Sequence, residues 1–381
     1  MVLGRLPCGP RNAITDVPGV LVGHQTLVRD TPTVVRTGVT AVVPHPGNVF
    51  RERPRAACYV FNGYGKSVGL PQLAELGVLE TPILLTNTLS VWTAANALVT
   101  HALERNPEIG STGGTVNPVA GECSDAYLND MRGRHVTEAD CLRALETATG
   151  GPVAEGNVGA GTGMSCLGFK GGIGTSSRAL TFGSGDFVLG CLVLANFGRL
   201  ADFRLDGVPV GRELEAAGWP DRPPGPPATV EEERRRVPSR ERMPAGPEEP
   251  PGGSIMIVVA TDAPLTSRQL TRIARRTTFG LARTGSVGAH GSGDFVLAFT
   301  TADLEPAYPS EPVLVRRTLV EDDRHFGPLF QGAAEAAEEA IINALFAAET
   351  VRGRDGHERK GLPVEQVIEI LRRRSPSGYR G

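Results

Sequence analysis

The residues of this 381-residue chain whose types and order best suit a chemical reaction lie at the junction Gly252-Gly253-Ser254-Ile255. A serine hydroxyl at the start of a strand can attack the preceding carbonyl carbon, here that of Gly253. The amide then becomes an ester, which water hydrolyses. Glycine before the serine favours this step because it accepts strained backbone conformations at low cost. The junction therefore predicts a chain that cleaves itself before Ser254.

Self-cleavage would leave Ser254 with a free α-amino group beside its hydroxyl. An α-amine has an unperturbed pKa of about 8, so it can act as a general base near neutral pH and activate the hydroxyl. Such a site needs no histidine, and the seven histidines of the chain form no His-Glu-x-x-His motif. The predicted chemistry is nucleophilic attack on amide bonds by an N-terminal serine.

The Gly-Ser dipeptide alone is weak support for this prediction. It occurs five times, before Ser111, Ser184, Ser254, Ser286 and Ser292, and by itself it describes an ordinary turn. The context of Ser254 is different. Ten of the 30 prolines lie in residues 220–253 together with charge runs, which predicts an exposed linker. Residues 255–260 then form an apolar run typical of a buried strand.

Strand and helix patterns alternate along the chain and must position this junction. Runs rich in β-branched residues predict strands over 20–28, 38–43, 57–61, 83–86, 187–195 and 255–260. Apolar spacing near 3.6 residues and helix-end signals predict helices over 71–79, 91–103, 139–149, 270–283, 332–352 and 364–374. Residues 156–185 are dense in Gly, Ser and Thr and predict loops that line a cleft.

One internal repeat stands out: GSGDFVL occurs at residues 183–189 and again at 291–297. Each copy predicts a glycine turn that leads into a buried strand. We interpret the pair as two similar corners in two layers of the fold, of which only one needs to be catalytic.

Composition limits the classes of function. A chain with 40% hydrophobic residues can bury a substantial core, as one large domain or two ordinary ones. A net charge of −3 without long like-charge blocks argues against nucleic-acid binding. The absence of an 18-residue apolar run or a secretory pattern predicts no membrane span and a cytoplasmic location. The six scattered cysteines predict reduced core thiols, and no metal or nucleotide cofactor is expected.

Nine sequence blocks occur in one order along the chain: RNAITDVPGVLVGH, NGYG, TNTLSV, ECSDAYLND, GIGTSSR, VLANFGR, GSIMIVVATDAPL, FGLARTGS and HGSGDFVLAFTTA. From about Asn12 to Ala347 the chain resembles the family of L-aminopeptidase/D-amino-acid esterases and β-peptidyl aminopeptidases. The resemblance implies an α+β fold, a four-layer α/β/β/α sandwich like that of the N-terminal-nucleophile hydrolases but with different connectivity. It also implies a single domain cut into a large α subunit (1–253) and a small β subunit (254–381), with four αβ pairs in a homo-oligomer.

The resemblance also assigns roles to residues. It places the nucleophile at Ser254, supporting groups at Ser292 and Asp294, an oxyanion-binding amide at Asn196, and the carboxylate that holds the substrate ammonium at Glu122. Each has an ordinary alternative. Asn196 could cap a turn, Glu122 could be a solvated loop residue, and Ser292 with Asp294 could form an Asx-type turn.

The sequence departs from the family pattern near the expected substrate pocket. Lys66 replaces the usual acidic residue after the NGxG turn, and Leu89 replaces a frequent histidine. Cys123 and Ser124 follow Glu122 where a bulkier or aromatic residue is expected. These changes leave the preferred side chain and stereochemistry (L-α, D-α or β) open.

Together these features predict an autoprocessing serine aminopeptidase or amidase that acts without a cofactor on short peptides, amino-acid amides or esters. An acyltransferase like the ornithine acetyltransferases is a second possibility, disfavoured because that group uses a threonine nucleophile. A third is an unprocessed binding or scaffold protein of the same fold, which a cleavage assay would separate from the enzyme.

Overall fold

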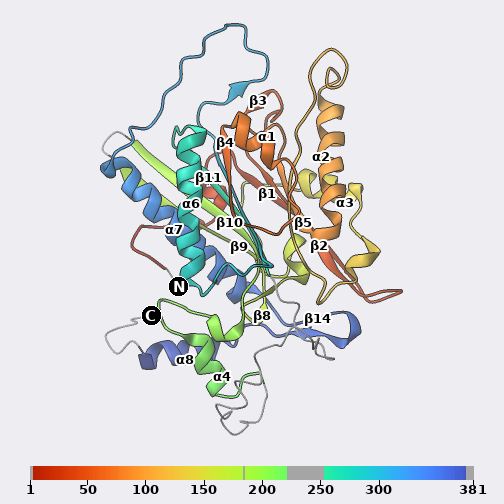
Figure 1. Ribbon diagram of the computed structural model, residues 1–381, viewed down its shortest axis with the longest axis vertical. Helices are drawn as coiled ribbons and strands as arrows, with labels where there is room; N and C mark the ends of the chain where they lie inside the picture. The colour runs from red at the N-terminus through yellow and green to blue at the C-terminus, as the bar shows by residue number, and fades with distance from the viewer. Residues whose placement is uncertain (1–2, 183–184, 221–252, 375–381) are drawn as a thin grey trace.

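The computed structural model describes residues 3–182, 185–220 and 253–374, and its centre consists of two β-sheets packed face to face (Figure 1). One sheet has the order β1-β2-β5-β6, from Leu21–Arg29, Val35–Val43, Ile83–Asn87 and Val119–Cys123. The other has the order β4-β12-β11-β10-β9, from Ala56–Gly63, Gly293–Thr300, Ser254–Thr261, Gly185–Asn196 and Gly172–Phe182. The remaining strands, β3, β7, β8, β13, β14 and β15, are two-residue pieces.

Helices cover the outer face of each sheet, so the molecule has four layers. α6 (Ser267–Arg283) and α7 (Asp323–Ala347) pack on the five-stranded sheet, and α2 (Val91–Arg105) and α3 (Glu138–Glu146) pack on the four-stranded sheet (Figure 1). Short helices α1 (Leu70–Leu76), α4 (Val210–Ala216) and α8 (Val364–Arg374) complete the described set. The α+β class and the α/β/β/α layer order predicted from the resemblance are confirmed.

Strand β11 shows why the run after Ser254 is apolar on both faces. Ile255, Ile257 and Val259 belong to the core beneath α6 and α7, whereas Met256 and Val258 belong to the core between the two sheets. Side chains alternate across a strand, so a central strand buried on both faces reads as a continuous apolar run. The predicted buried strand at residues 255–260 is confirmed.

Residues 172–182 correct the prediction of loops over 156–185. They form β9, which is buried along most of its length and packs against α7. A Cβ at Gly174 would come within 1.9 Å of the Ala340 carbonyl oxygen, and the Ser176 hydroxyl donates to the Ala336 carbonyl at 2.6 Å. Small residues are therefore needed here because the helix backbone lies directly on the strand. That requirement produces a composition typical of loops.

Two further predictions are corrected. The two copies of GSGDFVL lead into β10 and β12, which are strands of one sheet and not of two layers. The helix expected at 332–352 begins earlier and ends earlier, as α7, and residues 351–352 form β14. Most of the linker expected at 220–253 lies outside the described residues.

A buried charge network joins α7 to strand β9 and to the start of the chain. The fully buried Arg178 guanidinium donates to Glu335 at 3.3 Å and to Glu339 at 2.6 Å. Both carboxylates also accept hydrogen bonds from the N-terminal segment, including the Leu3 N–H on Glu339 at 3.2 Å and the Arg5 N–H on Glu335 at 3.0 Å. Buried charges need such paired, hydrogen-bonded partners.

Candidate active site

A cavity of about 380 Å³ opens where β10 ends and β11 and β12 begin. The residues around it come from both sheets and from the connecting segments: Tyr64, Gly65, Lys66, Thr88, Glu122, Ser124, Ala126, Tyr127, Met131, Ser165, Gly168, Asn196, Phe197, Gly198, Gly253, Ser254, Gly291, Gly293 and Arg359. Four of the predicted site residues meet in this cavity: Gly253, Ser254, Asn196 and Glu122.

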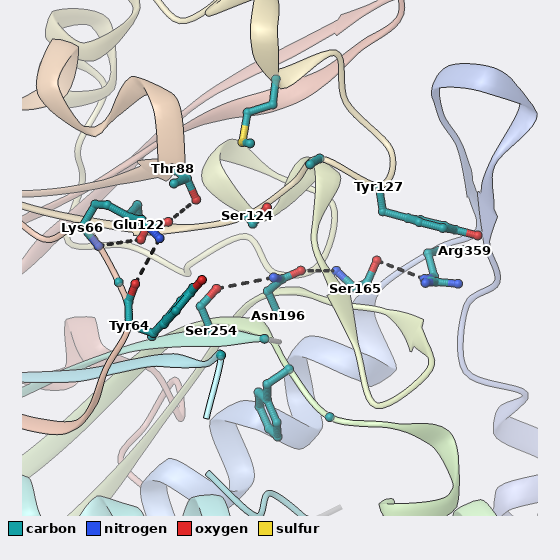
Figure 2. A pocket seen from close by; sticks show the side chains of 18 of the residues that line it. Tyr64, Lys66, Thr88, Glu122, Ser124, Tyr127, Ser165, Asn196, Ser254 and Arg359 are labelled. Atoms are coloured by element: carbon teal, nitrogen blue, oxygen red, sulfur yellow. Dashed lines mark hydrogen bonds between the residues drawn. The ribbon is translucent and has the colours of Figure 1, made fainter. Parts of the chain in front are cut away.

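Ser254 and Asn196 are opposite each other in the β10–β11 ladder. The Asn196 side-chain amide donates to the Ser254 hydroxyl at 3.4 Å, and its carbonyl oxygen accepts the Ser165 backbone N–H at 2.9 Å (Figure 2). An N–H donor can only face an acceptor, so Ser165 fixes the amide with its NH₂ toward the hydroxyl. Asn196 therefore does more than cap a strand end. It presents a donor beside the hydroxyl, as an oxyanion-binding group requires.

Gly253 lies in a tight, polar position immediately before Ser254. Its carbonyl oxygen accepts the Gly293 backbone N–H at 3.1 Å. A Cβ at this position would come within 2.7 Å of the Phe197 Cα and 3.0 Å of the Asn196 carbonyl oxygen. Glycine is therefore required by close backbone packing, and the carbonyl that precedes Ser254 already has a hydrogen-bond donor.

Ser292 and Asp294 lie beside Ser254 but do not line the cavity. Gly293 pairs with Ser254, and Asp294 pairs with Ile255, so the Asp294 side chain lies on the face toward α6 and α7. The Ser292 hydroxyl donates to one Asp294 carboxylate oxygen at 2.6 Å. The other carboxylate oxygen is buried without a hydrogen-bond partner among the described residues.

Burial raises the pKa of Asp294 above its usual value, although the hydrogen bond from Ser292 and the nearby Ile255 N–H act in the opposite direction. In this uncut chain no hydrogen bond joins Ser292 or Asp294 to the Ser254 hydroxyl within the described parts.

Glu122 is the fourth residue of β6 and is 3% exposed, so the alternative of a solvated loop residue is wrong. The Thr88 hydroxyl donates to one of its carboxylate oxygens, and the Lys66 backbone N–H donates to the other at 2.8 Å (Figure 2). These neutral donors fix the carboxylate without neutralising its charge. Glu122 thus remains able to bind a cation in the cavity.

The far side of the cavity carries an arginine. Arg359 of β15 (Glu358–Arg359) donates from Nε to the Ser165 hydroxyl at 3.1 Å, and its guanidinium lies 3.7 Å from the centre of the Tyr127 ring. The Tyr127 ring also stacks on His357, with centroids 4.5 Å apart. Ser254 lies between this basic end and the acidic end at Glu122 (Figure 2).

Several contributors escaped the sequence prediction. The Asn62 amide donates to the carbonyls of Ala289 at 3.0 Å and His290 at 3.1 Å, and so holds the loop that carries Ser292. Ser165, Thr88 and Arg359 also act through contacts that spacing along the chain cannot reveal. The blocks NGYG and TNTLSV, which contain Asn62 and Thr88, were the available signal.

The other departures from the family pattern have different locations. Cys123 is fully buried, and its thiol donates to the Leu194 carbonyl at 3.4 Å; burial raises its pKa well above the usual range. Ser124 lines the cavity, whereas Leu89 does not.

Among the described residues, no three His, Cys, Asp or Glu side chains are grouped to hold a metal ion. In the same part of the chain, no helix combines the length and apolar character needed to cross a bilayer.

Known proteins resemble this chain in both sequence and structure. Residues 12–359 match the sequence profile of peptidase family S58. The chain is 38% identical to the beta-peptidyl aminopeptidase BapA of Sphingosinicella microcystinivorans, over 96% of this chain and 89% of that protein. The crystal structure of the PH0078 protein from Pyrococcus horikoshii is 46% identical and superposes with a TM-score of 0.87 over 98% of each chain.

A further similar structure is the L-aminopeptidase D-Ala-esterase/amidase from Ochrobactrum anthropi. It is described as a prototype for the serine aminopeptidases and as a new variant among the Ntn hydrolase fold. It is 35% identical to this chain, with a TM-score of 0.83 over 97% of each chain. The similarity therefore extends over the whole fold and includes all the elements that surround the cavity.

Proposed function

The chain belongs to peptidase family S58 and is an aminopeptidase, and on this premise we propose that Ser254 is its nucleophile after the chain has cut itself before that residue. The observation that carries the proposal is the placement of Ser254 between the Asn196 amide and the Glu122 carboxylate in one cavity. The substrates are short peptides, amino-acid amides or esters with a free amino group.

In this mechanism Glu122 binds the substrate ammonium, which places the first carbonyl carbon near the Ser254 hydroxyl. The free α-amine of Ser254 removes the hydroxyl proton, and the oxygen attacks the carbonyl carbon. The Asn196 NH₂ donates to the developing oxyanion, an interaction that typically lowers the barrier by about 3 kcal/mol. The leaving amine departs toward Ser165, Tyr127 and Arg359, and water then hydrolyses the acyl-enzyme ester.

Two features of the uncut chain support self-cleavage. The Gly293 N–H already donates to the Gly253 carbonyl oxygen, so negative charge that forms there during attack by Ser254 has a donor. The unpartnered Asp294 oxygen lies one residue along the ladder from Ser254. A carboxylate beside a newly formed ammonium gains a charge-assisted partner. The products are residues 1–253 and residues 254–381, which we expect to remain together as an αβ pair in a cytoplasmic homo-oligomer.

The experiment compares the wild type with Ser254→Ala by denaturing electrophoresis, intact mass and release of p-nitroaniline from aminoacyl p-nitroanilides. We expect two wild-type fragments, the smaller beginning at Ser254, and a single inactive chain for the variant. An intact wild-type chain that is folded would instead favour an unprocessed binding protein. A cut chain that transfers acyl groups to amines but does not hydrolyse anilides would favour an acyltransferase.

A further inference from the structure

We propose that Lys66 makes this enzyme prefer N-terminal residues that carry a free carboxylate, such as aspartyl, isoaspartyl or glutamyl residues. The inference rests on the proposed function, because it assumes that Glu122 holds the substrate ammonium. It goes further by naming a specificity-determining residue and the class of N-terminal residue that this residue selects.

The position of Lys66 is fixed at the Glu122 end of the cavity. Its backbone N–H donates to Glu122, and its ammonium donates to the Tyr64 carbonyl at 3.0 Å and lies 4.7 Å from the centre of the Tyr64 ring (Figure 2). All three residues line the cavity. Within the described parts of the chain the Lys66 ammonium forms no ion pair, and the groups that it contacts are the Tyr64 carbonyl and ring.

The balance of charge at this end favours an anionic substrate group. Before substrate binds, the Glu122 carboxylate and the Lys66 ammonium balance each other. A bound substrate ammonium pairs with Glu122 and leaves the Lys66 charge without an anion. A carboxylate on the same substrate residue restores neutrality, whereas a neutral side chain does not and a basic one adds repulsion. The Lys66 side chain is exposed, so water screens its charge and the expected preference is moderate.

The experiment uses isosteric substrate pairs that differ only in charge. Aspartyl and asparaginyl p-nitroanilides form one pair, glutamyl and glutaminyl anilides form a second, and the β-aspartyl anilide with its α-carboxamide (isoasparaginyl) counterpart forms the third. The kcat/KM ratio within each pair measures the preference for the carboxylate, and the three pairs distinguish α-linked from β-linked residues. We expect the wild type to favour the acid in at least one pair by about fivefold, mainly through KM.

The side chain can be changed without disturbing the backbone contact to Glu122. Lys66→Gln should bring the ratio of the favoured pair to near one, Lys66→Glu should invert it, and Lys66→Arg should retain most of it. Added salt should reduce the wild-type ratio and leave the Lys66→Gln ratio unchanged. Arg143→Gln, a loss of one positive charge on the exposed surface of α3, is the matched control and should keep the wild-type ratio.

A wild type that cleaves both members of every pair equally, while Ser254→Ala is inactive, overturns the inference and leaves the proposed function standing. A preference that survives in Lys66→Gln also overturns it, because another cation would then be responsible. If the folded wild type cleaves none of the six anilides nor an alanyl or β-alanyl anilide, the proposed function fails and the inference fails with it.

Discussion

The two copies of GSGDFVL have the same residues and belong to the same sheet, yet only one lies at the cavity. β10, which begins within the first copy, is antiparallel to β11, and β12, which begins within the second copy, is parallel to it. Leu189, the last residue of the first copy, therefore pairs with Thr261 at the far end of β11, whereas Gly293 of the second copy pairs with Ser254. Asp186 of the first copy is exposed on a β9–β10 hairpin, whereas Asp294 is 2% exposed.

The difference shows that strand direction determines what the motif can do. In the second copy the glycine turn delivers a backbone donor to Gly253 and a carboxylate to the start of β11. In the first copy the described residues, from Gly185 onward, lie at the opposite end of β11. What β10 contributes to the cavity is its last residue, Asn196, and not the repeat at its start.

The largest expected effect on activity is the difference between two substitutions at opposite ends of β10. Asn196→Ala removes the donor to the oxyanion and should lower kcat/KM for an aminoacyl anilide by about 10²- to 10³-fold. Asp186→Asn, at the other end of the same strand, should change kcat/KM less than about twofold because an exposed carboxylate so placed contributes little. Equal losses in the two variants would mean that the strand acts through stability and that the comparison fails.

The second contrast is between the two aspartates of the repeat. Asp294→Asn should slow self-cleavage or lower kcat/KM by about tenfold to a hundredfold, since a charge-assisted hydrogen bond to the new ammonium contributes about 1.5–3 kcal/mol. Fragment formation is followed by electrophoresis over time and activity by anilide hydrolysis, with Asp186→Asn as the matched control. Normal cleavage and normal activity in Asp294→Asn would remove Asp294 from the mechanism.

Substitution of the phenylalanine in each copy of the repeat tests how much its packing contributes to stability. Phe295 lies in the core between the sheets and its ring contacts the turn at Gly65, whereas Phe187 is only partly buried. Phe295→Ala should lower the free energy of unfolding by about 3 kcal/mol or more and Phe187→Ala by about 1 kcal/mol, because the cost depends on the buried area and the cavity left. Urea unfolding in the uncut Ser254→Ala background gives both values. A reversed order would contradict the burial assigned to the second copy.

The smallest effect concerns pH. Burial raises the pKa of Asp294 in the folded uncut chain, so the folded state holds this proton more tightly than the unfolded state. Its contribution to stability is then full below the unfolded pKa of about 4 and is lost as the pH rises through the folded pKa. In the Ser254→Ala background, Asp294→Asn should become more stable relative to its parent as the pH rises from about 4 to about 7. Urea unfolding at both pH values checks the sign, and Asp186→Asn should leave the dependence unchanged.

The sequence was informative where local pattern and tertiary environment agree. The apolar run after Ser254 predicted β11 because that strand is buried on both faces, and the ordered blocks predicted the four-layer fold. It failed at β9, where small residues serve close packing under α7 and imitate a loop. It also failed to show that both copies of the repeat enter one sheet, because strand order and direction depend on long-range pairing.

The candidate site likewise contains residues that the sequence predicts and groups that it does not. Ser254, Asn196 and Glu122 were predicted from motifs and lie in one cavity. Two of the groups that orient them could not be predicted: the Ser165 and Lys66 contacts come from backbone N–H groups, which every residue except proline possesses. Their role depends only on where the fold places them, and no side-chain pattern records it.

The strand order of the five-stranded sheet has a consequence for the product of self-cleavage. β11 and β12 come after Gly253, and they lie between β10 and β4, which come before it. Arg178 and the N-terminal segment, from the earlier part of the chain, are bound to α7 of the later part. A cut before Ser254 would thus divide the covalent chain without creating two bodies that can separate on dilution. Melting would remain one cooperative event, and fragments produced apart would have no preformed surface through which to reassemble.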